Sequence, residues 1–236
     1  MKTLSAAVFT ASLLLLSLTA AGADAAEITA DVLTYNGVSK TASAQGNIII
    51  KDEGAVMTGS SGEYHFNDRS AYLTGGVTYQ KEDTSLTAAS VTLSGDQTLH
   101  GTGSVVIHDG ERSLYGDDVT YNTNTGYGLA EGSARAELPD GTITAPRMEG
   151  NLKGIRITAA GGVHIVSDPH QLTADGDTAV YTKSPDADDG RIVLTGNARA
   201  TQNGNTFTGP ELDMDLRANL IQTKGRSTLI ITNTNA

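Results

Sequence analysis

The fold of this chain is decided by the stretch AYLTGGVTY at residues 71–79. Its apolar side chains alternate with Tyr72, Thr74 and Thr78, and this period of two predicts a β-strand with one buried face and one solvent face. Gly75 falls in phase with the buried side chains, in mid-strand, where a glycine weakens a strand. We therefore expect a sharp bend at Gly75, with no room for a Cβ on its concave side.

The same glycine recurs along the chain at intervals of 28 or 29 residues, with one interval of 35. The copies are Gly46, Gly75, Gly103, Gly132, Gly161, Gly196 and, more weakly, Gly225. A second signal, an apolar residue followed by Thr and a small residue, keeps the same period, as at 57–59 and 86–88. Two patterns that share one period predict a repeat protein. The longer interval contains residues 183–190, which we interpret as an enlarged surface loop.

The second strand of each repeat is also predicted to bend. Leu86 and Ala88 are followed by Val91 and Leu93, so the apolar phase slips by one residue, as an inserted bulge residue makes it do. Two prolines stand at this slip position of their own repeats, and proline is tolerated in sheets mainly at bulges and edges. They are Pro146 and Pro210.

Turn signals alternate between two rims, for example Asp109-Gly110 on one and Asn67-Asp68 on the other. Each repeat is therefore two bent antiparallel strands. The predicted fold class is all-β: a bent antiparallel β-jellyroll or meander of about 14 strands, built from repeats of about 29 residues. Bends at mid-strand fold the sheet into a V-shaped trough, roughly 65 Å long at a strand spacing of about 4.8 Å.

Residues 1–25 are predicted to be a cleaved secretory signal peptide. Lys2 precedes an apolar run that contains Leu13 to Leu16, and Ala23-Asp24-Ala25 fits a cleavage site. The alternative is a retained membrane anchor, but the run is near the lower length limit for a span. Residues 26–236 are then a single repeat domain that is exported.

Composition excludes several function classes. The chain has no cysteine, so it has no disulfide and no thiolate metal site, and its net charge of −11 argues against a nucleic-acid partner. Its five histidines show no metal-ligand spacing, and its Asp-rich stretches match no calcium motif. We expect no catalytic residue, no metal, no cofactor and no enzymatic activity.

The buried face of the trough is the candidate functional site. It is mostly aliphatic, and two interpretations are open: walls that close into a dry sandwich core, or walls that splay into a groove suited to acyl chains. The candidate groove residues share inward-facing strand positions. They are Ile48, Ile50, Leu73, Val77, Tyr79, Leu99, Val105, Ile107, Ile157, Val163, Ile165 and Leu194.

Several short motifs resemble the OstA-like family of the lipopolysaccharide export system. They are ADVLTY at 30–35, AQGNI at 44–48, YLTGGV at 72–77, LTAD at 172–175 and LTGNA at 194–198. The resemblance covers nearly all of 27–236 and is to the free periplasmic bridge component. It implies a jellyroll that carries the acyl chains of lipopolysaccharide. It also implies end-to-end association and partners anchored in the inner membrane and embedded in the outer membrane.

The two ends of the meander are predicted assembly edges, because each presents unpaired backbone donors and acceptors. The edge residues are Ile28 at one end and Leu229, Ile230 and Ile231 at the other. Joining the last strand of one copy to the first of the next gives head-to-tail self-association.

Two rival functions are a secreted structural or adhesive β-repeat protein with a closed core, and a β-solenoid enzyme such as a polysaccharide lyase. The lyase would carry clustered charged residues on one strand face. The equivalent positions do not form such a set: Ile49, Thr78, Val106, Arg135, His164 and Arg199.

Overall fold

The computed structural model describes residues 25–184 and 187–232. In those ranges the chain forms a single sixteen-stranded sheet and no helix, so none is long and apolar enough to cross a membrane. The all-β class is therefore confirmed. The strands are β1 Glu27–Thr29, β2 Val32–Asn36, β3 Thr41–Asp52, β4 Ala55–His65, β5 Ser70–Lys81, β6 Thr84–Leu93, β7 Thr98–Asp109, β8 Arg112–Asn122, β9 Tyr127–Leu138, β10 Gly141–Asn151, β11 Arg156–Ser167, β12 Leu172–Thr182, β13 Arg191–Gln202, β14 Asn205–Asp215, β15 Leu220–Lys224 and β16 Thr228–Ile230.

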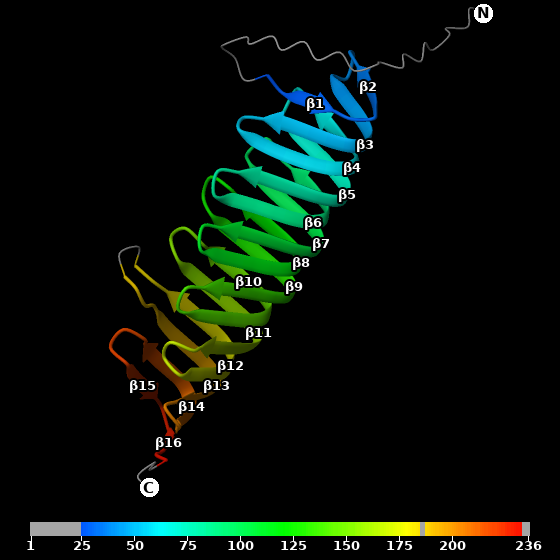
Figure 1. The fold of residues 1–236 in the computed structure, drawn as a ribbon. Helices are drawn as coiled ribbons and strands as arrows, with labels where there is room; N and C mark the ends of the chain where they lie inside the picture. Colours follow the sequence, from blue (N-terminus) through cyan, green and yellow to red (C-terminus); the bar gives the residue numbers. More distant parts are fainter. Residues whose placement is uncertain (1–24, 185–186, 233–236) are drawn as a thin grey trace, which may run out of the picture.

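Strands β3 to β14 form a meander in which each strand pairs with its neighbours in sequence (Figure 1). The ladders are antiparallel throughout. At one end β1 and β2 both pair with β3, and at the other β15 and β16 both pair with β14. The sequence predicts about 14 strands because the repeat pattern treats β1 with β2 as one bent strand and β15 with β16 as another. The structure splits these two at their bends, where an end strand has a hydrogen-bonding neighbour on one side only.

The bends are confirmed, and each is a two-residue corner. In β5 the register to β6 jumps from the pair Thr74–Ser90 to the pair Val77–Ala88. The residues between, Gly75 and Gly76, have φ angles of 88° and 74°. The same left-handed pair recurs in the other odd-numbered long strands: Gly46-Asn47, Gly103-Ser104, Gly132-Ser133, Gly161-Gly162 and Gly196-Asn197. Glycine or a small polar residue is needed there because a Cβ disfavours a positive φ.

The predicted place of the bend glycine, on the buried concave side, is wrong. Gly75 is exposed, and a Cβ built on it would lie 2.6 Å from the Cβ of Ser60 on the neighbouring strand. The corner turns both of its residues outward. The corner inserts two residues, which leaves the alternation of inward and outward side chains unchanged beyond it. Leu73 and Val77 therefore both point inward. Gly75 lies midway between them in the sequence, so alternation alone assigns it to the inward face as well.

The slip in the even-numbered strands is confirmed. In β6 the buried apolar side chains are Leu86, Ala88, Val91 and Leu93. Pro146 in β10 and Pro210 in β14 both lie within the register shifts of their ladders. A proline at these positions breaks no ladder hydrogen bond, which explains why the repeat accepts it.

Gly161→Val is expected to lower the free energy of unfolding by about 1–3 kcal/mol. Gly161 has a φ of 95°, and an added Cβ would lie 3.1 Å from Cγ of Pro146. A β-branched side chain would be strained by both. Urea denaturation measures the change, and Thr173→Val, at an exposed strand position, is the neutral control. An unchanged urea midpoint in Gly161→Val would contradict the corner geometry.

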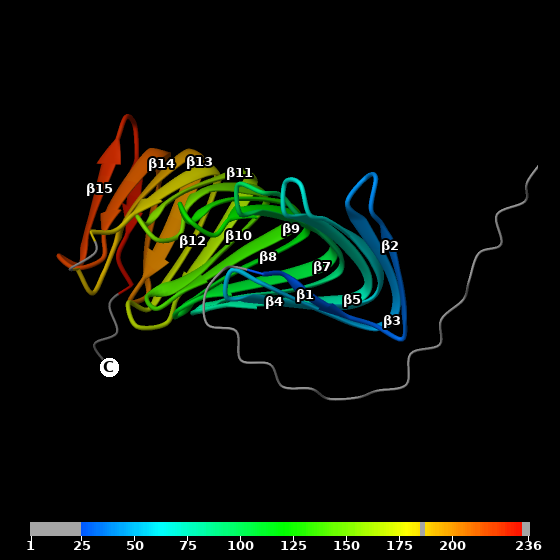
Figure 2. The same ribbon diagram turned by 90° about the horizontal axis from the view of Figure 1, so that it is seen from above.

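The turns form two rims, which run along the two free margins of the folded sheet. Rim A holds the turns at 53–54, 82–83, 110–111, 139–140, 168–171 and 203–204. Rim B holds those at 37–40, 66–69, 94–97, 123–126, 152–155 and 216–219, together with 183–190 in its described part. The strands curve around a shared interior, as Figure 2 shows. We call the line along which the two rims face each other the seam.

Candidate functional site: the apolar interior and its seam

All twelve candidate groove residues lie in the interior, and none is more than 3% exposed. They belong to one continuous apolar cluster that includes residues from every strand between β3 and β14. The cluster is aliphatic except for Tyr64, Tyr79, Tyr121 and Tyr181. The interior is therefore one uninterrupted apolar layer along the whole length of the sheet.

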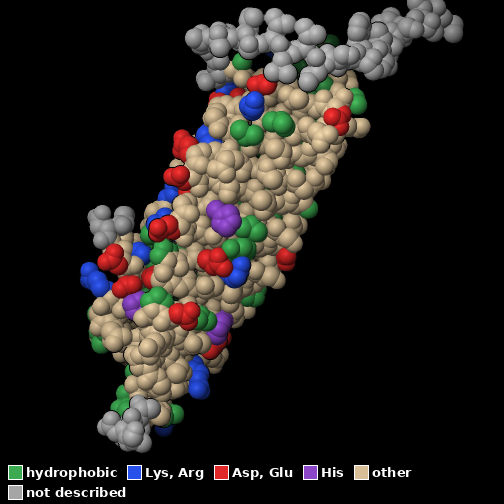
Figure 3. Space-filling view, in the orientation of Figure 1, with side chains coloured by type: hydrophobic (Ala, Val, Ile, Leu, Met, Phe, Trp, Pro, Cys, Tyr) green, Lys and Arg blue, Asp and Glu red, His purple; other side chains and the backbone are tan. Residues whose placement is uncertain are grey.

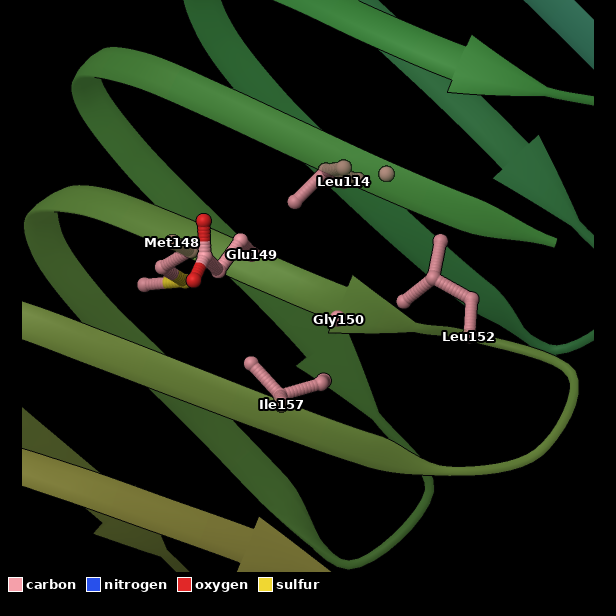
Figure 4. A pocket seen from close by; sticks show the side chains of 7 residues that line it. Leu114, Met148, Glu149, Gly150, Leu152 and Ile157 are labelled. Atoms are coloured by element: carbon pink, nitrogen blue, oxygen red, sulfur yellow. The ribbon is translucent and has the colours of Figure 1, made fainter.

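The two walls of the trough pack against each other. Two interior cavities, one of them drawn in Figure 4, have about 10 Å³ each, which is at the lower limit for one water molecule. The larger hollows of 410 to 490 Å³ lie outside the core, for example one across the outer surface of β2 to β5. An acyl chain can therefore occupy the interior only if the walls separate.

Three Tyr–Asp hydrogen bonds join the rims across the seam. The hydroxyl of Tyr64, at the rim B end of β4, donates to Oδ2 of Asp52, at the rim A end of β3, over 2.6 Å. Tyr121 in β8 donates in the same way to Asp109 in β7. Tyr181 in β12 donates over 2.7 Å to Oδ2 of Asp140, in a rim A turn. We call these three pairs the latches.

Further polar contacts also cross the seam. Arg69 of rim B forms an ion pair with Glu53 of rim A, and Lys81 Nζ donates to Oε1 of Gln97 over 3.1 Å. Other pairs across the seam include His170–Asp189 at 2.9 Å, Gln202–Asn219 at 2.8 Å and Arg112 to the Leu152 carbonyl at 2.8 Å. Together with the latches, they close the trough along its length.

Burial raises the pKa of Tyr64, Tyr121 and Tyr181 far above the usual 10.0, and the hydrogen bond that each donates to a carboxylate raises it further. These tyrosines therefore stay neutral in the folded chain at a pH at which exposed tyrosines ionise. Tyr79 in β5 is a related case: its hydroxyl is buried with no hydrogen-bond partner among the described residues, and burial raises its pKa.

The latches predict a loss of stability in alkaline solution. Because the folded-state pKa of these tyrosines is raised, their contribution is fully present below the unfolded value of 10.0 and is lost as the pH rises from there toward the folded value. Urea midpoints measured by circular dichroism should fall between pH 10 and about 12. A variant with Phe in place of Tyr64, Tyr121 and Tyr181 should be less stable at neutral pH but should show a shallower alkaline fall. Equal slopes would contradict this account.

The outer faces of the sheet carry exposed hydrogen-bonded pairs of histidine and aspartate. His164 lies 2.7 Å from Asp175 and His100 lies 2.9 Å from Asp118, all four half-exposed. Across residues 25–184 and 187–232, no three His, Cys, Asp or Glu side chains group in a way that could hold a metal ion. On the face shown in Figure 3, acidic and basic side chains mix along the margin occupied by the turns. Exposed pairs of this kind contribute little stability.

The two ends of the sheet are exposed and apolar. Ile28 in β1 pairs with Ile50 and packs partly against the core, while Val32, Leu33 and Tyr35 in β2 are exposed. At the other end Leu229, Ile230 and Ile231 are 51%, 57% and 66% exposed. Strand β16 stops at Ile230, so Ile231 lies just beyond it.

Comparison with known proteins identifies the family. The model of the family described as "LptA/(LptD N-terminal domain) LPS transport protein" matches residues 95–219, from just before β7 to beyond the end of β14. The chain belongs to this family. A second family model, "OstA-like protein", matches residues 17–100, so the OstA-like resemblance of the repeat motifs is confirmed. The LPS transport family is one of transport proteins by its description, and none of the site features above requires an enzyme.

A solved structure with a similar chain is LptH, described as the LptA homologous periplasmic component of the conserved lipopolysaccharide transport device from Pseudomonas aeruginosa. It is 20% identical, and the match covers 63% of this chain and 94% of that chain with a TM-score of 0.28. No curated protein matches the chain.

Proposed function

We propose that this chain is a periplasmic lipopolysaccharide carrier that holds the acyl chains of its ligand in the apolar interior. The observation that carries the proposal is the continuous aliphatic cluster from β3 to β14 in a member of the LPS transport family. Acyl chains need burial but no directional bonds, and this interior offers burial without polar partners. The twelve inward residues from Ile48 to Leu194 are the proposed lining.

Binding requires the two walls to separate, and the apolar character of both walls lowers the free-energy cost of this separation. An acyl chain between them would replace contacts of wall with wall by contacts of wall with lipid, so apolar surface stays buried on both sides. The hydrogen-bonded ladders run along each wall and not across the interior. Opening at the corners therefore leaves most of the ladder intact.

We propose further that the chain bridges the two membranes by joining sheet edges. The exposed β2 and β16 edges can each add a strand from another member of the family, or from a second copy. A contact between β16 of one copy and the first strands of the next is open-ended and would make the interiors continuous. Inner-membrane-anchored and outer-membrane lipopolysaccharide-transport proteins are the proposed end partners, and the signal peptide, which lies outside the described residues, is the proposed export signal.

Mass spectrometry of the protein purified from a bacterium that makes lipopolysaccharide tests the proposal. We expect an acylated glycolipid to co-purify, and protein made in a strain that lacks it to be empty. The packed interior favours one second candidate, a structural β-repeat protein with a closed core. Protein free of lipid in both strains would support that candidate and overturn the carrier.

A further inference from the structure

The inward face of the sheet has a gap beside rim B. Gly128 in β9 and Gly150 in β10 are direct partners in the ladder, so two adjacent inward positions carry no side chain. At the matching end of β8 stands Tyr121, and the strand after β10 presents Ile157. The gap forms the cavity of Figure 4, which is partly open to solvent. Its lining includes Leu114, Met148, Leu152 and Ile157, and we call it the notch.

The seam beside the notch has no latch. In sheet order, the Tyr121–Asp109 latch lies on one side of it and the Tyr181–Asp140 latch on the other. Between them, a single hydrogen bond among the described residues crosses the seam: Arg112 of rim A donates to the carbonyl of Leu152 on rim B over 2.8 Å. Leu152 also lines the notch. Burial raises the pKa of Tyr121 and of Tyr181, and the positive charge of Arg112 lies close enough to both to oppose part of this rise.

We propose that the acyl chains of the ligand enter the interior sideways, through the seam at the notch, and that the Arg112–Leu152 bond is the strap that holds this opening shut. The proposal rests on the proposed carrier function and assigns the site of loading. Both small interior cavities are partly open to solvent, but the second is lined by Asp140 and Tyr181 of a latch, whereas beside the notch one neutral acceptor holds the rims together. The alternative is loading from an open end of the sheet.

The same geometry gives Arg112 a second task. Once its guanidinium leaves the Leu152 carbonyl, it stands at the mouth of the opening, where the headgroup of an inserted lipid must remain. An arginine binds phosphate or carboxylate in a bidentate manner, which a backbone carbonyl cannot match. An anionic headgroup would therefore both release the strap and take its place.

A reversible staple tests the proposal. The chain has no cysteine, so Arg112→Cys with Lys153→Cys introduces one pair across the seam at the notch. A bis-maleimide linker with an internal disulfide closes the pair, and a reductant reopens it. We expect the stapled protein to take up fluorescently labelled lipopolysaccharide at least tenfold more slowly in stopped flow, and reduction to restore the rate. The matched control is Arg191→Cys with Asp213→Cys, an ion pair along rim B alone, where the staple should leave uptake unchanged.

A second experiment fills the notch with a larger side chain. In Gly128→Val the new Cβ would lie 3.0 Å from Cδ2 of Leu114 and 3.3 Å from the ring of Tyr121, both side-chain atoms that can shift. We expect uptake to slow about tenfold, while Gly154→Val, at an exposed turn position of the same rim, stays within twofold. Circular dichroism establishes that each variant is folded.

The outcomes separate the two proposals. Uptake that is unaffected by both the notch staple and Gly128→Val would mean that lipid loads from an end of the sheet, which overturns the notch but leaves the carrier function standing. If neither the wild-type protein nor any variant takes up lipopolysaccharide, the carrier function fails, and the loading site with it.

Discussion

Val105→Asp is expected to reduce lipopolysaccharide capture by the chain at least tenfold. Val105 is buried in the middle of the interior, two residues after the corner at Gly103, and pairs with Gly116 across the ladder. A carboxylate there would have no partner in an apolar layer and would repel acyl chains held beside it. It should also cost about 3–5 kcal/mol of stability, as an unpaired buried charge does. The measurement is photo-crosslinking to lipopolysaccharide from a benzoyl-phenylalanine at Val77.

The control variant is Val106→Asp, the next residue, whose side chain points to the outer face. It should keep both its stability and its lipid capture. A second comparison moves the photo-crosslinker by one position. At Val77 it should trap lipid, and at exposed Thr78, whose hydroxyl contacts that of Thr58, it should trap none. Capture at Thr78 and not at Val77 would mean that the lipid lies on the outer face.

Ile230→Pro is expected to abolish self-association. Light scattering of the wild-type chain should show a mass that climbs with concentration without reaching a fixed value, as an open contact requires. Strand β16 pairs with β14 on one side and with no other strand of residues 25–184 and 187–232, and Ile230 is among its exposed residues. Proline removes the backbone donor of this edge and disrupts its pairing, so the variant should remain near monomer mass.

Ile230→Thr is the matched control, because it keeps the backbone donor and the β-branched shape while removing apolar surface. It should associate more weakly than wild type but more strongly than the proline variant. A wild-type chain that stays monomeric at high concentration would overturn assembly through this edge. It would leave the lipid-binding proposal untouched.

The bends, the rims and the inward-facing residues could be predicted from the sequence because each is a local property. Alternation assigns Leu73 and Val77 to one face, and the slip after Ala88 marks a bulge, whatever lies opposite. The same rule placed Gly75 on the wrong side. A two-residue corner preserves parity, so alternation alone cannot distinguish an inward glycine from an outward corner.

The latches could not be predicted, because they depend on how closely the two walls approach. Tyr121 and Asp109 are twelve residues apart in the chain but stand on opposite rims. The period of two gives the face of Tyr121 and says nothing of what its hydroxyl reaches across the interior. How closely the two walls pack decides between a dry core and a groove. Alternation does not predict this either, because it assigns each residue a face and not what lies opposite it. The notch did leave a signal: Gly128 and Gly150 occupy positions at which other repeats carry larger side chains.

The sequential ladder of Figure 1 makes this molecule nearly one-dimensional, because each strand from β4 to β13 forms ladders only with the strands before and after it. In such an array, stability is approximately a sum of one term for each repeat and one for each contact between neighbouring repeats. The length of the sheet then depends on the number of repeats. A whole repeat could be added or removed if one new pair of neighbouring strands can form its ladder. The one long interval of 35 residues shows that extra chain is absorbed at a rim while the strand register continues. Evolution could therefore tune the distance that one copy spans by counting repeats, without redesigning a core.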